Sequence, residues 1–318
     1  PVVMVGFLEL NDSLSVWVIY PFLLFAGIGW VGDMTSRRAL VLEIVGTQRI
    51  DNAMAYESFT LASGVAVGNL IGGSVAQTLG VGEAFFVIGG LLLAGFLCLY
   101  WVPARTSVVS STASGSSSTL QELKEGFALV KTNQGLLSIL GVTVVANFFL
   151  FSYFPAVQRI GDRLDASPSQ VGLIAAMTGF GMMAGSLVTG LWEPKRRGRV
   201  YIGGVAFGLL VLIPFGLSNS VPMAAFTLFV AATGGGFFGA TQSTLVLTTV
   251  SDQMRGRAMG LLSMAIGALP VGTFVLGELA EPLGAPLAVV FMASIGLLAL
   301  ALWVSTHRQV LGMGRSAD

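Results

Sequence analysis

The residues from 49 to 80, RIDNAMAYESFTLASGVAVGNLIGGSVAQTLG, decide the fold. After the charged residues at its start, positions 52–80 include one charged side chain, Glu57. That apolar length is enough for a helix that crosses a bilayer. The glycines follow the pattern Gly64-x-x-x-Gly68-Asn69-x-x-Gly72-Gly73, which leaves a helix face bare enough for another helix backbone to approach closely. The stretch therefore predicts a membrane-spanning helix with a tight packing face.

The composition is that of a membrane protein. The chain has 318 residues, of which 54% are hydrophobic and 10% are charged, and its mean hydropathy is +0.83. Soluble globular domains carry about 25% charged residues. We therefore expect an all-α polytopic membrane protein, with the lipid bilayer as a partner. The zero net charge gives no indication of nucleic-acid binding, and the single cysteine, Cys98, excludes an intrachain disulfide.

Apolar runs separated by short polar connections predict about nine complete membrane-spanning helices. They fall at residues 14–32, 52–78, 84–102, 135–157, 171–192, 200–217, 223–247, 258–279 and 287–304. Residues 1–10 read as the end of a further, partial helix. Residues 103–133 differ, because 106–119 are rich in serine and 120–130 place apolar residues at helical spacing among charged ones. We expect a flexible linker followed by an amphipathic helix at the membrane surface.

The distribution of Lys and Arg predicts the orientation. If successive connections alternate between the two sides of the membrane, 14 of the 16 basic residues fall on one side. Arg159 and Arg163 fall on the other. The positive-inside rule makes the richer side cytoplasmic. We therefore expect a multi-pass protein of the cell membrane, with the linker at 103–133 and the tail at 307–318 in the cytoplasm.

The chain contains an internal repeat. Residues 39–55 (ALVLEIVGTQRIDNAMA) and 244–260 (TLVLTTVSDQMRGRAMG) are identical at seven of 17 positions. Apolar helices also resemble one another by composition, but Gln48 and the Leu-Gly turn after the repeated helix are not generic. The repeated helices stand six helices apart, so the two copies share one orientation. Further pairs, 204 positions apart, are Gly68 with Gly272, Gly73 with Gly277, and Gly80 with Gly284.

Parallel repeats about an axis along the membrane normal relate the two halves of major facilitator transporters, and the sequence resembles that superfamily over essentially its whole length. On the family's twelve-helix scheme the chain runs from the end of helix 3 to helix 12. The resemblance implies an N-terminal half at 1–102, the linker at 103–133, a six-helix C-terminal half at 134–306 and a tail at 307–318. It also implies two helices and part of a third before residue 1. We therefore expect the chain by itself to show an open groove on the N-terminal side and not to transport.

The glycine pattern is similar to a motif of the family's antiporters. That motif reads G-x-x-x-G-P-x-x-G-G in helix 5, and Asn69 stands where it has proline. Glu122-x-x-Glu125-Gly126 resembles the branch that includes siderophore and macrolide exporters. The resemblance implies a monomeric, proton-coupled exporter of small, bulky apolar molecules that works by alternating access. An importer of the same fold, or a non-transporting scaffold or receptor, is the alternative.

In this family helices 1, 4, 7 and 10 line the central cavity, which implies candidate substrate contacts at Trp17, Tyr20, Asn147, Tyr153, Phe237 and Gln242. Interhelical hydrogen bonding is the alternative interpretation for the polar side chains among them. The expected helix-packing positions are Gly64, Gly68, Asn69, Gly72, Gly73, Gly272 and Gly277. At Gly68 and Gly73 we expect contact with the backbone of another helix.

Glu57 is the carboxylate predicted to lie well inside a span of the N-terminal half. Because a charge within lipid is costly, such a residue is a functional candidate, and proton coupling is one interpretation. A structural ion pair with Arg38 or Arg49 at the membrane surface is the other.

An enzyme is not expected from these residues. The single histidine, His307, lies in the predicted tail, and there is neither a Gly-x-Ser-x-Gly motif nor a pair of mid-span aspartates. No ring of repeated charges suggests a channel. We expect no cofactor and no metal site.

Overall fold

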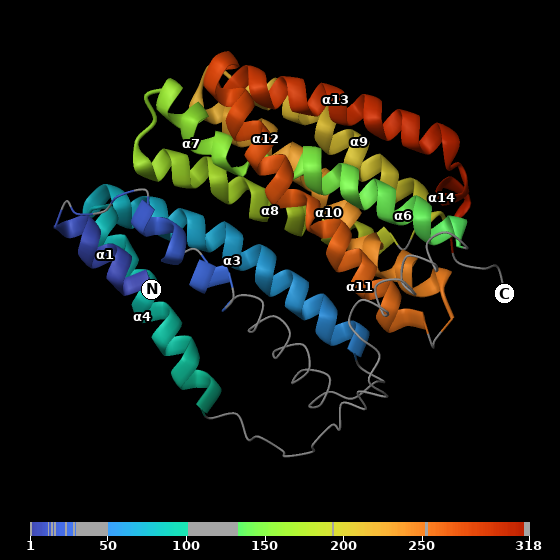
Figure 1. Ribbon diagram of the computed structural model, residues 1–318, viewed down its shortest axis with the longest axis horizontal. Helices are drawn as coiled ribbons and strands as arrows, with labels where there is room; N and C mark the ends of the chain where they lie inside the picture. The colour runs from blue at the N-terminus through green and yellow to red at the C-terminus, as the bar shows by residue number, and fades with distance from the viewer. Residues whose placement is uncertain are drawn as a thin grey trace.

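The computed structural model describes residues 2–11, 13, 15, 17–22, 24–27, 29, 50–100, 133–192, 194–251 and 254–314, with the backbone alone at 50–56, 58, 99 and 100. All regular elements in these ranges are helices, which confirms the all-α expectation (Figure 1). In chain order they are α1 (Val2–Leu10), α3 (Ile50–Thr78), α4 (Val81–Tyr100), α6 (Gln134–Val145), the π-helical η2 (Ala146–Leu150), α7 (Phe154–Arg163), α8 (Pro168–Trp192), α9 (Arg197–Gly216), α10 (Val221–Thr249), α11 (Arg255–Ile266), α12 (Ala268–Leu283), α13 (Ala285–Thr306) and α14 (Gln309–Gly312).

Eight helical segments within the described ranges are long and apolar enough to cross a membrane. They match the eight spans predicted from residue 52 onward, because an apolar chain in lipid satisfies its backbone polar groups by forming helices. Two of the eight are interrupted: 134–163 contains α6, η2 and α7, and 255–283 contains α11 and α12. Much of the predicted span at 14–32 lies outside the described residues, as do 103–132 and 315–318.

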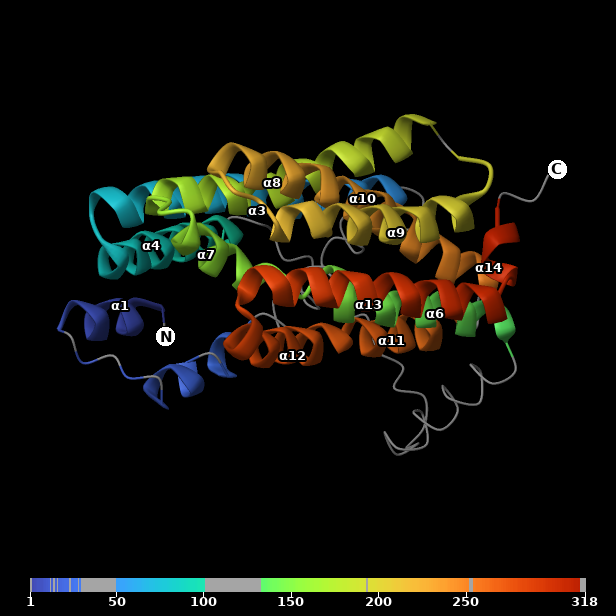
Figure 2. The ribbon, with the colours of Figure 1, turned by 90° about the horizontal axis from the view of Figure 1, so that it is seen from above.

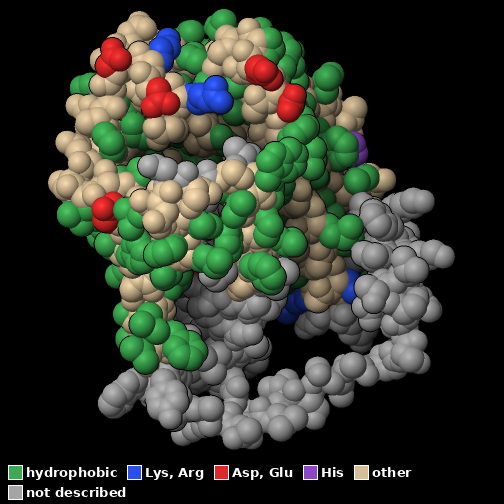
Figure 3. Space-filling view, turned by 60° about the vertical axis from the view of Figure 1, so that its left-hand side comes forward, with side chains coloured by type: hydrophobic (Ala, Val, Ile, Leu, Met, Phe, Trp, Pro, Cys, Tyr) green, Lys and Arg blue, Asp and Glu red, His purple; other side chains and the backbone are tan. Residues whose placement is uncertain are grey.

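The long helices run side by side, and the turns between them gather at two ends of the bundle (Figures 1 and 2). At one end Asn133 Nδ2 donates to Thr249 O (3.0 Å) and the Gly198 N–H donates to Met313 O (3.0 Å). The described basic residues in the turns and first helical turns of this end are Lys195, Arg196, Arg197, Arg199, Arg255, Arg257 and Arg308. Figure 3 looks toward the other end, where blue basic side chains lie among red carboxylates above a wide hydrophobic surface.

The buried core lies in the second half of the chain. In the span at Gln134–Arg163, 61% of the residues in the most apolar window are buried, against 6% for Val81–Cys98. The core therefore sits between α6 and α13, while α1, α3 and α4 expose most of their apolar side chains.

The packing of α1 on α4 repeats that of α9 on α13. A Cβ placed on Gly6 would lie 2.8 Å from Phe85 Cβ and 2.9 Å from Gly82 O. A Cβ on Gly216 would lie 2.7 Å from Pro286 O and 3.5 Å from Val289 Cβ. These partners are 204 positions apart, as in the sequence repeat. The two described glycines with positive φ, Gly80 (116°) and Gly284 (78°), are also 204 apart. The repeat is therefore present in the three-dimensional structure as well as in the sequence.

Among the described residues, only part of the expected packing face of α3 is in contact with another helix. A Cβ on Gly73 would lie 2.6 Å from Pro168 O and 2.8 Å from Gly172 Cα, so this glycine does allow backbone contact with α8. Around Gly64, Gly68 and Gly72, however, no described atom outside the local helix backbone lies within 4 Å of the added Cβ. The contact expected at Gly68 is therefore not found among the described residues.

Helical geometry explains the difference. Residues two positions apart on an α-helix point about 200° apart, so Gly64 and Gly68 lie roughly opposite Ala62 and Ala66. It is this second row that meets α8: a Cβ on Gly179 would lie 2.5 Å from Ala62 O and would also clash with the backbone of Ala66. The row continues at Asn69 and Gly73, since a Cβ on Gly172 would lie 2.5 Å from Asn69 O and 2.8 Å from Gly73 Cα.

The second copy shows the complementary arrangement. A Cβ on Gly272, the equivalent of Gly68, would clash with the backbone of Phe148 in η2. Gly277, the equivalent of Gly73, has no neighbour within 4 Å of the added Cβ, so its expected packing contact is not found among the described residues. Each copy thus uses one glycine of the pair and leaves the other bare.

Candidate functional site

The span at 134–163 is interrupted near its middle. Asn133 caps its start, where its Oδ1 accepts the Leu136 N–H at 2.9 Å. At Ala146 the hydrogen-bond register widens, and the Phe151 N–H donates to Ala146 O, five residues back, at 3.0 Å. The helix then stops and resumes at Phe154. Pro155 explains the restart, because proline has no N–H to donate to the preceding turn and suits the first turn of a new helix.

The span at 255–283 is interrupted in the same way. α11 ends at Ile266, and the Gly267 N–H donates to Ser263 O (3.1 Å) and Met264 O (3.0 Å). α12 begins at Ala268 and carries Pro270 in its first turn. A proline at this position cannot donate to the carbonyl four residues earlier, so the continuous ladder ends there.

The two interrupted spans touch each other. Gly272 of α12 lies directly against the backbone of Phe148 in η2. Figure 1 shows α12 beside α7, and α11, the first half of the same span, contacts α6. In transporters, interrupted helices that meet near the membrane midplane form the substrate and ion sites. We therefore take this junction as the candidate functional site.

The π turn is held by glycines from four helices. Each of the four residues from Phe148 to Phe151 packs so closely on a glycine of a neighbouring helix that a Cβ atom on that glycine would clash with it. These pairs are Phe148 with Gly272 of α12, Phe149 with Gly296 of α13, Leu150 with Gly208 of α9, and Phe151 with Gly235 of α10. The junction is therefore closely enclosed, and small residues on its neighbours are what allow a widened helical turn to fit.

A buried polar network adjoins the π turn and joins three helices. Thr143 Oγ1 and Tyr201 Oη lie 2.7 Å apart, and Tyr201 Oη donates to Ile139 O at 3.1 Å. Gln242 Nε2 of α10 donates to Thr143 Oγ1 at 3.3 Å. Asn147 Nδ2 donates to Thr143 O at 2.9 Å, at the point where the helix changes register. These bonds satisfy polar groups that would be costly if left unpaired in an apolar interior.

The structure does not bring the six predicted substrate contacts together. Asn147 and Gln242 are buried in the network, which is the interhelical hydrogen bonding weighed as their alternative role. Tyr153 is also buried, and its hydroxyl lies 3.0 Å from Thr178 Oγ1 of α8. Phe237 is half-buried beside Gly204. Trp17 is 82% exposed and lies against Tyr20, with ring centroids 6.0 Å apart. Substrate contact at these positions stays a prediction.

Glu57 lies half-buried on α3, seven positions before Gly64. Arg38 and Arg49, its proposed ion-pair partners, lie outside the described residues. Both interpretations of Glu57, proton coupling and a structural ion pair, therefore stay predictions.

Sequence reasoning missed Thr143, Tyr201 and Thr178. Each is a hydroxyl within an otherwise apolar run, and a single hydroxyl gives no indication of which helix it will bond to. The interruptions of the two spans could have been predicted from Pro155 and Pro270. The predicted spans at 135–157 and 258–279 instead placed each proline inside a single continuous helix.

Comparison with known proteins gives a consistent answer. The sequence profile described as Major Facilitator Superfamily matches residues 139–312. Macrolide efflux protein A of Streptococcus pyogenes is 22% identical over 290 residues, which cover 86% of this chain and 68% of that protein. The enterobactin exporter EntS of Escherichia coli is 25% identical over 299 residues, covering 89% and 68%. The uncharacterised MFS-type transporter YfiS of Bacillus subtilis is 25% identical over 304 residues, covering 90% and 72%. With the matched profile, the interrupted spans and the repeated packing of its two halves, the chain belongs to the major facilitator superfamily of membrane transporters.

Proposed function

We propose that this chain acts in the export of a small, bulky apolar molecule across the cell membrane, driven by protons. The observation that carries the proposal is the meeting of two interrupted spans beside a buried polar network of Thr143, Asn147, Gln242 and Tyr201. Such a junction offers a few hydrogen-bonding groups within an apolar and aromatic surround, which is the usual make-up of a small-molecule site. The exporter names of two relatives support the outward direction.

The mechanism we propose is alternating access by rocking of two halves, 1–102 and 134–306. Between the described parts of these halves, α3 meets α8 along Ala62, Ala66, Gly73, Gly172 and Gly179. Because these contact residues of α3 and α8 are alanine and glycine, no large side chain of one helix is inserted between residues of the other at these points. A seam of this kind suits the small sliding or rotating displacements that packed helices make when domains open and close.

We further propose that the glycine faces at Gly68 of α3 and Gly277 of α12 are packing surfaces for two more helices. In the second copy, Gly272 packs on η2, and in the first copy, Gly73 packs on α8. Under the repeat, an equivalent of the α6–α7 span would then cover Gly68, and an equivalent of α8 would cover Gly277. With these additions each interrupted span would have a counterpart in the other half, and the cavity would be enclosed on all four sides.

In this proposal the arginine-rich end of the bundle, the linker at 103–133 and the tail at 307–318 face the cytoplasm. Glu57 carries the coupling proton, because it is the carboxylate on α3 nearest to the glycine-lined interface. The protein works as a monomer, since the two halves of one chain supply both sides of the cavity.

Substrate protection tests the site. Asn147→Cys and Gln242→Cys, made in a Cys98→Ala background and expressed from the native gene, should be alkylated more slowly when a macrolide or another bulky amphiphilic compound is present. Thr248→Cys is the matched control. Thr248 is an exposed residue of α10, the helix that carries Gln242, and its hydroxyl donates only to backbone carbonyls of α10. Equal rates with and without every compound at both site positions would contradict a binding site at this junction.

A further inference from the structure

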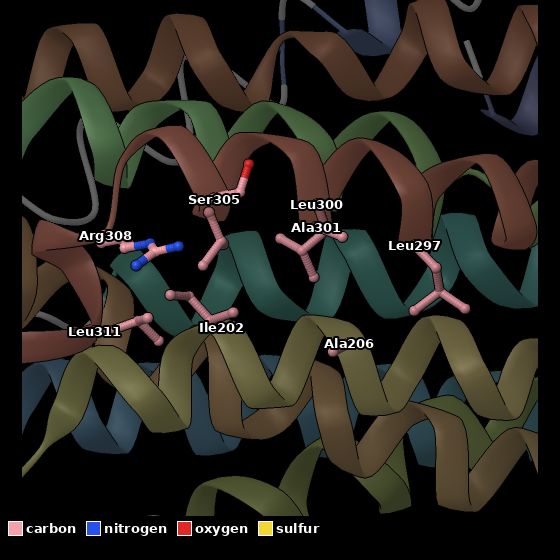
Figure 4. A pocket seen from close by; sticks show the side chains of 9 residues that line it. Ile202, Ala206, Leu297, Leu300, Ala301, Ser305, Arg308 and Leu311 are labelled. Carbon is pink, nitrogen blue, oxygen red and sulfur yellow. The ribbon is translucent and has the colours of Figure 1, made fainter.

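An apolar groove runs along the outside of the bundle between α9 and α13. Its cavity volume is about 390 Å³. Ile202 and Ala206 form one wall, and the other wall follows successive turns of α13. Figure 4 shows these side chains in a row between the two helices. The lining residues on α13, on α14 and in the turn between them are Leu297, Leu300, Ala301, Val304, Ser305, Arg308 and Leu311.

The groove opens onto the surface that faces lipid. Leu298 (65% exposed) and Leu302 (69% exposed) are next in sequence to the lining residues Leu297 and Ala301 of α13, and Leu210 (57% exposed) comes one helical turn after Ala206 on α9. None of the six predicted substrate contacts lines it. The groove is therefore separate from the junction of the interrupted spans, and what it meets in the membrane is a lipid chain.

One end of the groove is positively charged. Arg308 lines the cavity just after the end of α13, and in Figure 4 its guanidinium group extends along the row of lining side chains. Arg199 is exposed in the first turn of α9, three residues before Ile202 and so on the same helix face. Within the described ranges, neither arginine has a carboxylate partner. Both stand at the ends of membrane-spanning helices, which is the depth of lipid headgroups.

This end of the groove is also held firmly. The Gly198 N–H donates to Met313 O at 3.0 Å, and a Cβ on Gly198 would clash with Val310 O of α14. The start of α9 and the segment after α13 are thus fixed against each other, so Arg308 lines a preformed opening and Arg199 stands one helical turn before Ile202 of its α9 wall.

We propose that this groove binds one anionic phospholipid. An acyl chain lies between α9 and α13, and the headgroup phosphate accepts charge-assisted hydrogen bonds from Arg308 and Arg199. Guanidinium groups bind phosphate in a bidentate manner, and basic pockets between membrane helices recognise anionic headgroups. A zwitterionic lipid fits the apolar part equally well and carries the same phosphate, but its headgroup is neutral overall and adds a positive ammonium group that the two arginines repel. The inference concerns the membrane-facing surface and is independent of what the protein transports.

The test is a competition between lipids on the purified full chain. The detergent-solubilised protein is titrated with palmitoyl-oleoyl phosphatidylglycerol or palmitoyl-oleoyl phosphatidylcholine, and bound lipid is counted by native mass spectrometry. We expect one phosphatidylglycerol to bind in preference, and Arg308→Gln to weaken that preference about tenfold, which is the usual effect of losing a hydrogen bond to a charged group. Arg159→Gln is the matched control, since it removes an exposed arginine at the opposite end of the bundle.

A second variant tests the acyl-chain half of the site. Ala301 is an exposed groove residue, so Ala301→Trp fills the groove without entering the core and should reduce binding of both lipids there. Equal affinity for the two lipids, or an unchanged preference in Arg308→Gln, would overturn the proposal. Displacement of the lipid by millimolar inorganic phosphate would show a free-anion site and would overturn it as well.

Discussion

A pair of glycine substitutions on α3 distinguishes the packing face from the bare face. In Gly73→Ala the new methyl group would lie 2.6 Å from Pro168 O and 2.8 Å from Gly172 Cα, and both neighbours are backbone atoms that cannot rotate away. In Gly68→Ala the same methyl group would meet no atom of a described neighbouring helix within 4 Å. The two positions lie in one helix, five residues apart, and receive the same chemical change.

The two substitutions should change the unfolding free energy in opposite directions. Inserting a methylene-sized group into a closed contact costs about 1–3 kcal/mol, since α3 and α8 must separate. Gly→Ala within an unhindered helix is favourable by roughly 0.5–1 kcal/mol, because alanine loses less backbone entropy. Because both variants gain this helix term, it cancels in the comparison, and the two should differ in unfolding free energy by about 1–3 kcal/mol.

Reversible denaturation of the purified 318-residue chain in one detergent measures this difference. We expect Gly73→Ala to unfold at lower denaturant and Gly68→Ala at the same or higher denaturant than the parent chain. Equal destabilisation of both variants, or the opposite order, would refute the assigned packing face. The repeat supplies an independent check, since Gly272→Ala should be destabilising and Gly277→Ala should not.

Three further predictions follow from the described geometry and from the sequence. Tyr201→Phe removes the hydroxyl that joins α9 to α6 and should destabilise the chain by about 0.5–1.5 kcal/mol in the same denaturation assay; no loss would show that the bond contributes nothing. If Glu57 carries protons, Glu57→Gln should abolish pH-driven transport while leaving expression intact, whereas an unchanged pH profile would exclude that role. An impermeant thiol reagent added to intact cells should label a cysteine at Asp165, in the α7–α8 turn, but not one at Ser114 or Ser316, which lie outside the described residues; efficient labelling of the latter two would reverse the proposed orientation.

Helix positions could be predicted because each depends on a local property. An apolar run of sufficient length must become a helix in lipid, and the eight described spans from residue 52 onward follow this rule. The repeat was equally accessible, because glycine at 80 and 284 is required by positive φ in both turns.

Helix faces could not be predicted in the same way. Ala62 and Ala66 are also small enough for close helix packing, but the prediction was based on Gly64 and Gly68, which lie on the opposite face of α3. Which face of α3 packs depends on its partner helix, α8. The contacting residues of α8, Gly172 and Gly179, lie more than 90 positions after those of α3 in the sequence. The polar network has the same origin, since Tyr201 reaches Thr143 only after α9 and α6 have packed together.

The most direct test of the proposed transport is the efflux rate of a preloaded substrate from cells that express the protein from its native gene. We predict that a macrolide or another bulky apolar compound leaves these cells faster than cells without the gene, and that a protonophore removes the difference. Gln242→Leu should lower the rate at least tenfold, by analogy with the loss of a buried hydrogen bond to a binding site, while Thr248→Val should leave it unchanged. Faster uptake, or efflux that continues unchanged in the presence of the protonophore, would contradict proton-driven export.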